Sequence, residues 1–120
     1  MATFTKQILS NSTDGKAIKV AATATAGTLI HTGSTTTTTL DEVWLYAVNT
    51  STSNVKLTIE WGEATAPDGN IELSVVAESG LVLVVPGLLI KGNATALVVR
   101  AFAATADVIC IHGYVNQITV

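Results

Sequence analysis

Few residues in this sequence could carry metal or nucleophilic chemistry. The two histidines, His31 and His112, lie far apart in the chain, with no H-x-H or H-x-x-x-H spacing. A metal site would need them close in space with a carboxylate or thiolate. Cys110 is the single cysteine and lies in an apolar run, which favours a small buried hydrophobic residue over a nucleophile. We therefore predict no metal site.

Motifs built on serine, carboxylates or glycine loops are also lacking. There is no G-x-S-x-G nucleophile elbow, no G-x-G-x-x-G and no phosphate loop. Glu60, Glu63, Glu72 and Glu78 have the spacing of solvent-facing strand and loop carboxylates. A glycosidase pair among them stays open as an alternative, although only two Trp and two Tyr are available for a sugar platform. We expect no catalytic residue and no cofactor, so the chain is not expected to be an enzyme.

Composition limits the classes of protein further. The chain has 120 residues, of which 48% are hydrophobic and 12% charged, with a net charge of -3. So many apolar residues exclude a disordered chain, and the lone cysteine excludes a disulfide framework. Six dispersed cations argue against nucleic-acid binding. No apolar stretch reaches the ~18 residues of a membrane helix, and no signal peptide is apparent. We expect one domain made in a reducing cytoplasm, with no membrane partner.

The elements that must position any site are β-strands, because apolar residues recur with a period of two. Residues 55–61 and 71–75 alternate apolar and polar, whereas residues 43–48 are apolar on both faces. Further strands are expected at 16–22, 27–32, 81–85, 94–103 and 108–118, with a short one at 6–10 and an ambiguous segment at 88–90. Residues 1–15 are expected to form an N-terminal arm, and residues 16–120 a single domain.

Seven to nine short strands and no helix predict an all-β fold, an antiparallel β-sandwich that is jelly-roll-like or related. The absence of Cys-Trp-Cys spacing disfavours the antibody-type immunoglobulin fold. The polar segment 49–54 predicts a hairpin between strands 43–48 and 55–61. The run of five threonines at 35–39 is expected to be a solvated loop or edge strand, with an extended arm that orders against a partner as the sharper alternative.

The surface is the unusual feature of the sequence. Globular proteins carry about a quarter of their residues as charged side chains, about twice the share found here. Runs such as 81–85 and 97–99 are apolar on both faces, whereas one face of each sandwich strand is normally wet. Another copy or another chain is therefore expected to cover the second face, unless loops of the same chain or a barrel-like closure do so. Candidate subunit contacts are Trp44, Tyr46, Leu83 and Val85.

Four segments resemble small virion structural proteins of tailed bacteriophages: 40–51, 55–62, 83–89 and 111–118. The likeness extends over roughly residues 17 to 118 and rests on packing and turn motifs. It implies a capsid decoration (cement) protein, a homo-oligomer, most often a trimer, on the virion capsid surface. It also implies a major capsid protein as partner, with neighbouring capsid subunits bridged so that the shell resists the pressure of its DNA.

A second hypothesis is a receptor- or glycan-binding module of a phage tail or fibre, since sandwiches are common lectin scaffolds. The loops 49–54 and 62–70 would then form the site. A small enzyme ranks last, because the residues supply no evident acid/base pair.

Overall fold

A computed structural model describes all 120 residues. It contains nine β-strands, joined by loops and turns, and no helix. Because there is no helix, none is long and apolar enough to cross a membrane. The strands are β1 (Thr3–Ile8), β2 (Ile18–Lys19), β3 (Thr28–Thr32), β4 (Leu40–Asn49), β5 (Val55–Trp61), β6 (Asn70–Val75), β7 (Val82–Lys91), β8 (Val98–Ala103) and β9 (Ile109–Thr119).

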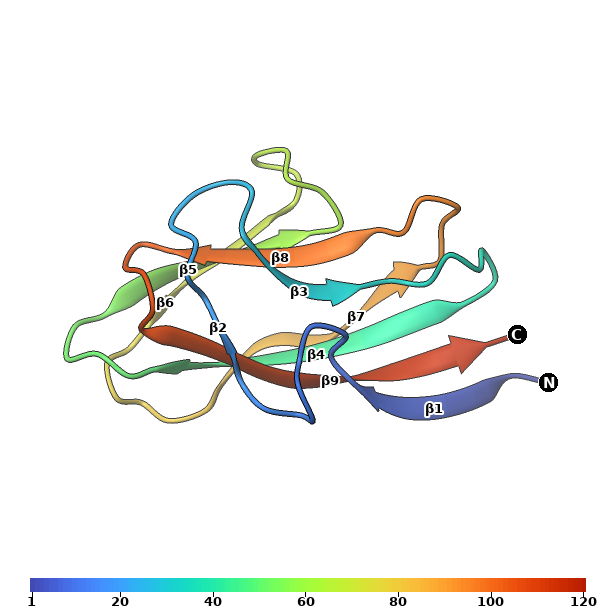
Figure 1. Cartoon of the computed structure of the whole chain (residues 1–120), viewed down its shortest axis with the longest axis horizontal. Coiled ribbons are helices and arrows are strands. Elements are labelled where there is room, and N and C mark those ends of the chain that lie inside the picture. Colours follow the sequence, from blue (N-terminus) through green and yellow to red (C-terminus); the bar gives the residue numbers. More distant parts are fainter.

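The strands form two antiparallel sheets that lie one above the other (Figure 1). Sheet A has the order β1-β9-β4-β7, with β2 also paired to β9, and sheet B has the order β3-β8-β5-β6. With β1 and β2 taken as two parts of one strand, every connection except β5–β6 passes from one sheet to the other. This is the strand order of an eight-stranded jelly roll, so the predicted all-β sandwich is confirmed.

The core lies between the sheets and consists of aliphatic side chains. Alternate residues of the central strands point into it, so that Val43, Leu45 and Ala47 of β4 are fully buried while their neighbours are half-buried. The other large, fully buried side chains include Leu9, Ile30, Leu57, Ile59, Ile109 and Ile111. Period two in the sequence therefore located β5 and β6 and their inner faces correctly.

The predicted hairpin between strands 43–48 and 55–61 is wrong. β4 pairs with β7 and β9 in sheet A, whereas β5 pairs with β6 and β8 in sheet B. The polar segment 50–54 therefore crosses between the sheets. Asn49 fixes its conformation, because the Asn49 side-chain amide donates to the carbonyls of Ser53 and Val75, each at 2.9 Å.

The outer face of sheet B is partly covered by this chain's own loop between β2 and β3. Glu60 of β5, predicted to face solvent, is 1% exposed. Its Oε1 accepts from the backbone N–H of Gly27 at 2.7 Å, and its Oε2 accepts from the Thr25 hydroxyl at 2.8 Å. Arg100 of β8 donates to the Gly27 carbonyl at 3.2 Å. The prediction that Glu60 is a wet carboxylate is wrong, because a loop distant in sequence folds over it.

The N-terminal segment is part of the sandwich. β1 pairs antiparallel with β9 from Thr3↔Thr119 to Ile8↔Tyr114, and the next residue, Leu9, lies in the core. The threonine run forms the β3–β4 loop. Residues 35–38 are exposed and Thr39 is buried, which agrees with the solvated-loop alternative.

Candidate functional site

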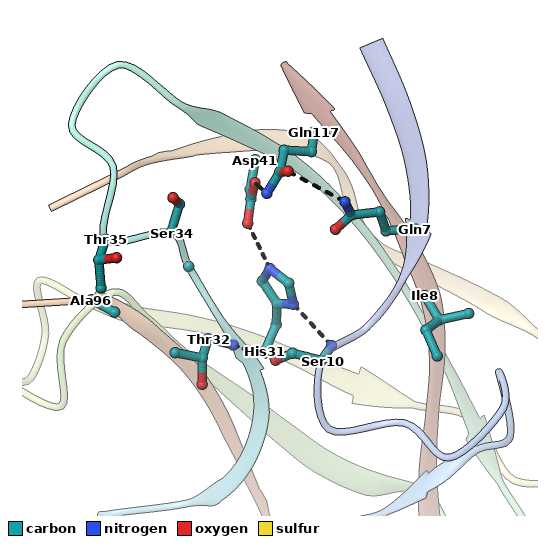
Figure 2. A pocket seen from close by; sticks show the side chains of 11 residues that line it. Gln7, Ile8, Ser10, His31, Thr32, Ser34, Thr35, Asp41, Ala96 and Gln117 are labelled. Carbon is teal, nitrogen blue, oxygen red and sulfur yellow. Dashed lines mark hydrogen bonds and ion pairs between the residues drawn. The ribbon is translucent and has the colours of Figure 1, made fainter. Parts of the chain in front are cut away.

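A polar pocket of about 400 Å³ lies where β1, β3, β4 and β9 meet (Figure 2). At its base lie His31 and Asp41, two buried ionisable side chains that are hydrogen-bonded to each other. His31 of β3 is 3% exposed and Asp41 of β4 is 2% exposed. The His31 Nε2 and Asp41 Oδ2 atoms are 2.8 Å apart. This His–Asp pair is therefore a candidate catalytic site.

A continuous hydrogen-bond chain accounts for every polar atom of this pair. The backbone N–H of Ser10 donates to His31 Nδ1 at 3.1 Å, so the ring proton lies on Nε2 and is donated to Asp41. Gln117 of β9 donates to the second carboxylate oxygen, Asp41 Oδ1, at 3.0 Å. Gln7 of β1 in turn donates to Gln117 at 3.3 Å. The chain thus links both sheets and the N-terminal strand.

The pocket contains Ser, His and Asp side chains without the geometry of a nucleophile and its base. Both ring nitrogens of His31 are occupied, and neither contacts a hydroxyl. The Ser10 hydroxyl oxygen accepts from the Thr32 backbone N–H at 2.7 Å, and that of Ser34 accepts from Thr36 at 2.9 Å. An activated serine requires a hydrogen bond between its hydroxyl oxygen and the imidazole, and no such bond is present here. We therefore interpret the His31–Asp41 pair as a structural contact between the two sheets.

The second candidate is the outer face of sheet A, where the side chains that point away from the core are mainly apolar and aromatic. Cross-strand register places these residues in rows, because directly opposed residues share a face. The face comprises Phe4, Lys6 and Ile8 of β1; Lys19 of β2; Cys110, His112, Tyr114, Asn116 and Ile118 of β9; Leu40, Glu42, Trp44, Tyr46 and Val48 of β4; and Leu83, Pro86, Leu89 and Lys91 of β7.

Four of the six aromatic side chains in the protein lie on this face. Trp44 and Tyr114 are neighbours on β4 and β9, with ring centroids 6.0 Å apart and ring planes at 9°. Lys6 of β1 lies over the Tyr114 ring, with Nζ 5.0 Å from the centroid. On the other side of Trp44, a Cβ atom at Gly87 would come within 2.8 Å of the indole, so only glycine fits there. The rings of this row are therefore already packed against their neighbours.

Glu42 is fixed in the middle of this apolar face. The Trp44 indole N–H and the Asn116 amide both donate to Glu42 Oε1, at 2.7 and 3.0 Å. These two hydrogen bonds, that from Trp44 first, hold the pKa of Glu42 below its usual value. A permanent negative charge thus occupies a defined position on a face that otherwise has few charges.

The structure separates the four predicted contact residues into two groups. Trp44, Tyr46 and Leu83 all point outward from sheet A, and Leu83 is directly opposite Tyr46 and 47% exposed. Val85 is opposite Leu45 and completely buried in the core. Val85 cannot touch another subunit while this fold is kept, because β7 turns it inward. The exposed leucines of β7 are Leu83, Leu88 and Leu89.

The residues first considered for metal chemistry are dispersed. His31 is interior, whereas His112 and Cys110 lie on the outer face of sheet A, and Cys110 is half-buried rather than fully buried. No group of three or more His, Cys, Asp and Glu side chains could hold a metal ion. The loops 49–54 and 62–70 lie at opposite ends of β5, so a seven-residue strand separates them by roughly 20 Å and they form no common site.

Sequence reasoning missed Asp41 and Asn116 as site residues. The signal for Asp41 was present, because it continues the inward alternation of Val43, Leu45 and Ala47 by two residues. Its partner His31 could not be inferred, since it lies on a strand of the other sheet. Asn116 similarly gains its role only from pairing between β4 and β9, which are distant in sequence.

Comparison with known proteins adds no relative: no family model, no curated protein and no solved structure matches this chain.

Proposed function

We propose that this chain is a non-enzymatic structural protein of a virion, of the capsid decoration type. In this role it attaches to the outside of a phage capsid, associates with itself and bridges major capsid subunits. The observation that carries the proposal is the outer face of sheet A, where Phe4, Leu83 and Leu89 are exposed beside three half-buried aromatic side chains, those of Trp44, Tyr46 and Tyr114. Contiguous apolar surface of this kind marks a protein contact.

The two sheets differ in a way that supports this proposal. Glu60 and Thr58, on the outer face of sheet B, are buried, and the β2–β3 loop of the same chain binds Glu60. On the corresponding face of sheet A, Phe4, Ile8 and Leu89 are at least half exposed. The chain thus covers one outer face and leaves the apolar one available to another subunit.

Bridging requires a second contact surface, and the β6–β7 connection offers one. Val76 and Leu81 are 53% and 58% exposed within this six-residue connection. Each adds little affinity alone, but many copies on a repeating lattice gain through avidity. A contact with few charges also loses little affinity at high salt.

The glycan-binding alternative has weaker support. Its two proposed loops lie at opposite ends of β5. The Trp44 and Tyr114 rings already stack on one another, with Lys6 and Gly87 on their outer sides, which leaves little open ring face for a sugar. The jelly roll serves both capsid and lectin domains, so the fold does not decide between them.

The test is the copy number of this chain in its native particle, combined with binding to emptied heads. Hundreds of copies per particle, and binding that the double variant Val76→Lys/Leu81→Lys abolishes, are expected. The matched control Glu78→Lys lies in the same connection and should bind as the wild type does. A dozen copies or fewer would assign the chain to the tail or a vertex and contradict the proposal. Reproducible binding on a glycan array would favour the alternative.

A further inference from the structure

We infer that the outer face of sheet A packs against the same face of a second copy, with β9 lying along the two-fold axis. This inference rests on the proposed self-association and names its geometry. A two-fold contact is isologous, so each residue on one side of the axis meets the residue at the mirror position in the partner. Such a contact requires that residues on either side of the axis in each row of sheet A be complementary in charge or both apolar.

The charged row is self-complementary about β9. It reads Lys6 on β1, Asn116 on β9 and Glu42 on β4, with one strand spacing on each side of the centre. A two-fold axis along β9 therefore brings Lys6 of each copy opposite Glu42 of the other. Glu42 is held in place by Trp44 and Asn116, so the negative partner of this ion pair is preorganised.

Two apolar rows agree with the same axis, whereas the Cys110 row would place Lys19 of β2 opposite Val48. Ile8 and Trp44 flank Tyr114, so each Ile8 would meet the partner copy's indole. Phe4 and Leu40 flank Ile118 in the same way. An axis across the strands along the Tyr114 row would instead place Glu42 against Tyr46 and leave Lys6 without an opposite charge. Charge complementarity thus selects the axis along β9.

The size of the face suits a specific pair. The view in Figure 1 is down the shortest axis, and the sheets stack along the middle one, so the sheet face extends over the 48 and 21 Å dimensions. These extents limit the face to roughly 1,000 Å², which leaves room for the ~800 Å² per partner of a standard interface. Sheets pack face to face about 10 Å apart with strands nearly aligned, which an axis along β9 produces. A two-fold pair would take the place of the trimer that the family resemblance implies.

Charge reversal tests the pairing. Lys6→Glu and Glu42→Lys each place like charges opposite one another, so each variant should associate at least about tenfold more weakly than the wild type. Mixing the two variants restores opposite charges at both positions, and mixed pairs should form with an affinity close to that of the wild type. Circular dichroism of each variant before mixing shows that it is folded. Two folded variants that fail to form mixed pairs would overturn the inference.

Cross-linking tests the axis without touching the charges. In a Cys110→Ser background, His112→Cys places one thiol per copy near the centre of β9, close to the axis. A bis-maleimide with a spacer no longer than ~10 Å should link it into covalent pairs. The matched control, Ser74→Cys on sheet B, should stay single. Equal linking at both positions, or none at position 112, would refute the geometry.

The inference and the proposed function fail in different ways. Wild-type protein that stays single but binds emptied heads, and loses that binding on Leu83→Lys, would show that the capsid covers this face. The proposed function would then stand, and the two-fold pair would be wrong.

Discussion

His31 is bonded at both ring nitrogens inside the molecule, and this residue-scale clamp connects the two sheets. Replacing His31 with Ala leaves the buried carboxylate of Asp41 with one donor and the Ser10 N–H with none. Unsatisfied buried groups cost roughly 1–3 kcal/mol each, so we expect His31→Ala to lower the free energy of unfolding by about 3 kcal/mol in urea titrations. His112→Ala, on the outer face, should change it by under about 1 kcal/mol. Equal effects of both variants would contradict the clamp.

Glu42 gives the stability of the protein a predictable pH dependence. The pKa of Glu42 in the folded state is lowered, first by the Trp44 indole and then by Asn116, so the carboxylate stabilises the folded protein above the pKa of an unfolded glutamate. That stabilisation is lost as the pH falls through the lowered folded-state pKa. We therefore expect Glu42→Gln to be less stable than the wild type at neutral pH, with the difference shrinking as the pH falls below the pKa of an unfolded glutamate. A constant difference in urea midpoint across this range would argue against the Glu42 assignment.

At the scale of elements, the Glu60 carboxylate holds residues 25–27 of the β2–β3 loop on sheet B, together with Arg100, which donates to the Gly27 carbonyl. Glu60→Ala removes the acceptor for both Gly27 and Thr25, and we expect a loss of about 2–3 kcal/mol with faster amide exchange over residues 20–27. Glu72→Ala removes an exposed glutamate that pairs with Lys56 at 3.2 Å on the same sheet, and should cost under about 1 kcal/mol. Protection of residues 20–27 that survives Glu60→Ala would show that other contacts hold the loop.

The hydrophobic pattern of the sequence predicts individual strands but not their pairing. Period two located β5 and β6 and their inward residues, because alternation is a property of each strand alone, whereas β4 was located as a run that is apolar on both faces. It could not assign strands to sheets, so β4 and β5 were paired wrongly across segment 50–54. It also could not show that a loop covers Glu60, or that β7 turns Val85 inward and Leu83 outward. Those facts depend on contacts between residues distant in sequence.

At the scale of the whole molecule, the two outer faces differ in how far the chain itself covers them. Sheet B is partly covered by its own loop, whereas sheet A presents Trp44, Tyr46 and Leu83 to the surroundings. Low charge and two-sided apolar strands predicted a covered second face from sequence. Residues 43–48 and 82–85 of these runs belong to sheet A, whereas Val98 and Val99 belong to sheet B. The occupant of the outer face of sheet A is the remaining question at this scale.

Sedimentation equilibrium of the purified wild-type chain over a range of concentrations, beside the folded variant Lys6→Glu/Ile8→Glu, tests the pairing of sheet A most directly. The account predicts a wild-type mass that rises to twice the 12.4 kDa of one chain, while the variant stays at one chain mass. A wild-type protein that remains at 12.4 kDa at every concentration would contradict the pairing of sheet A with a second copy.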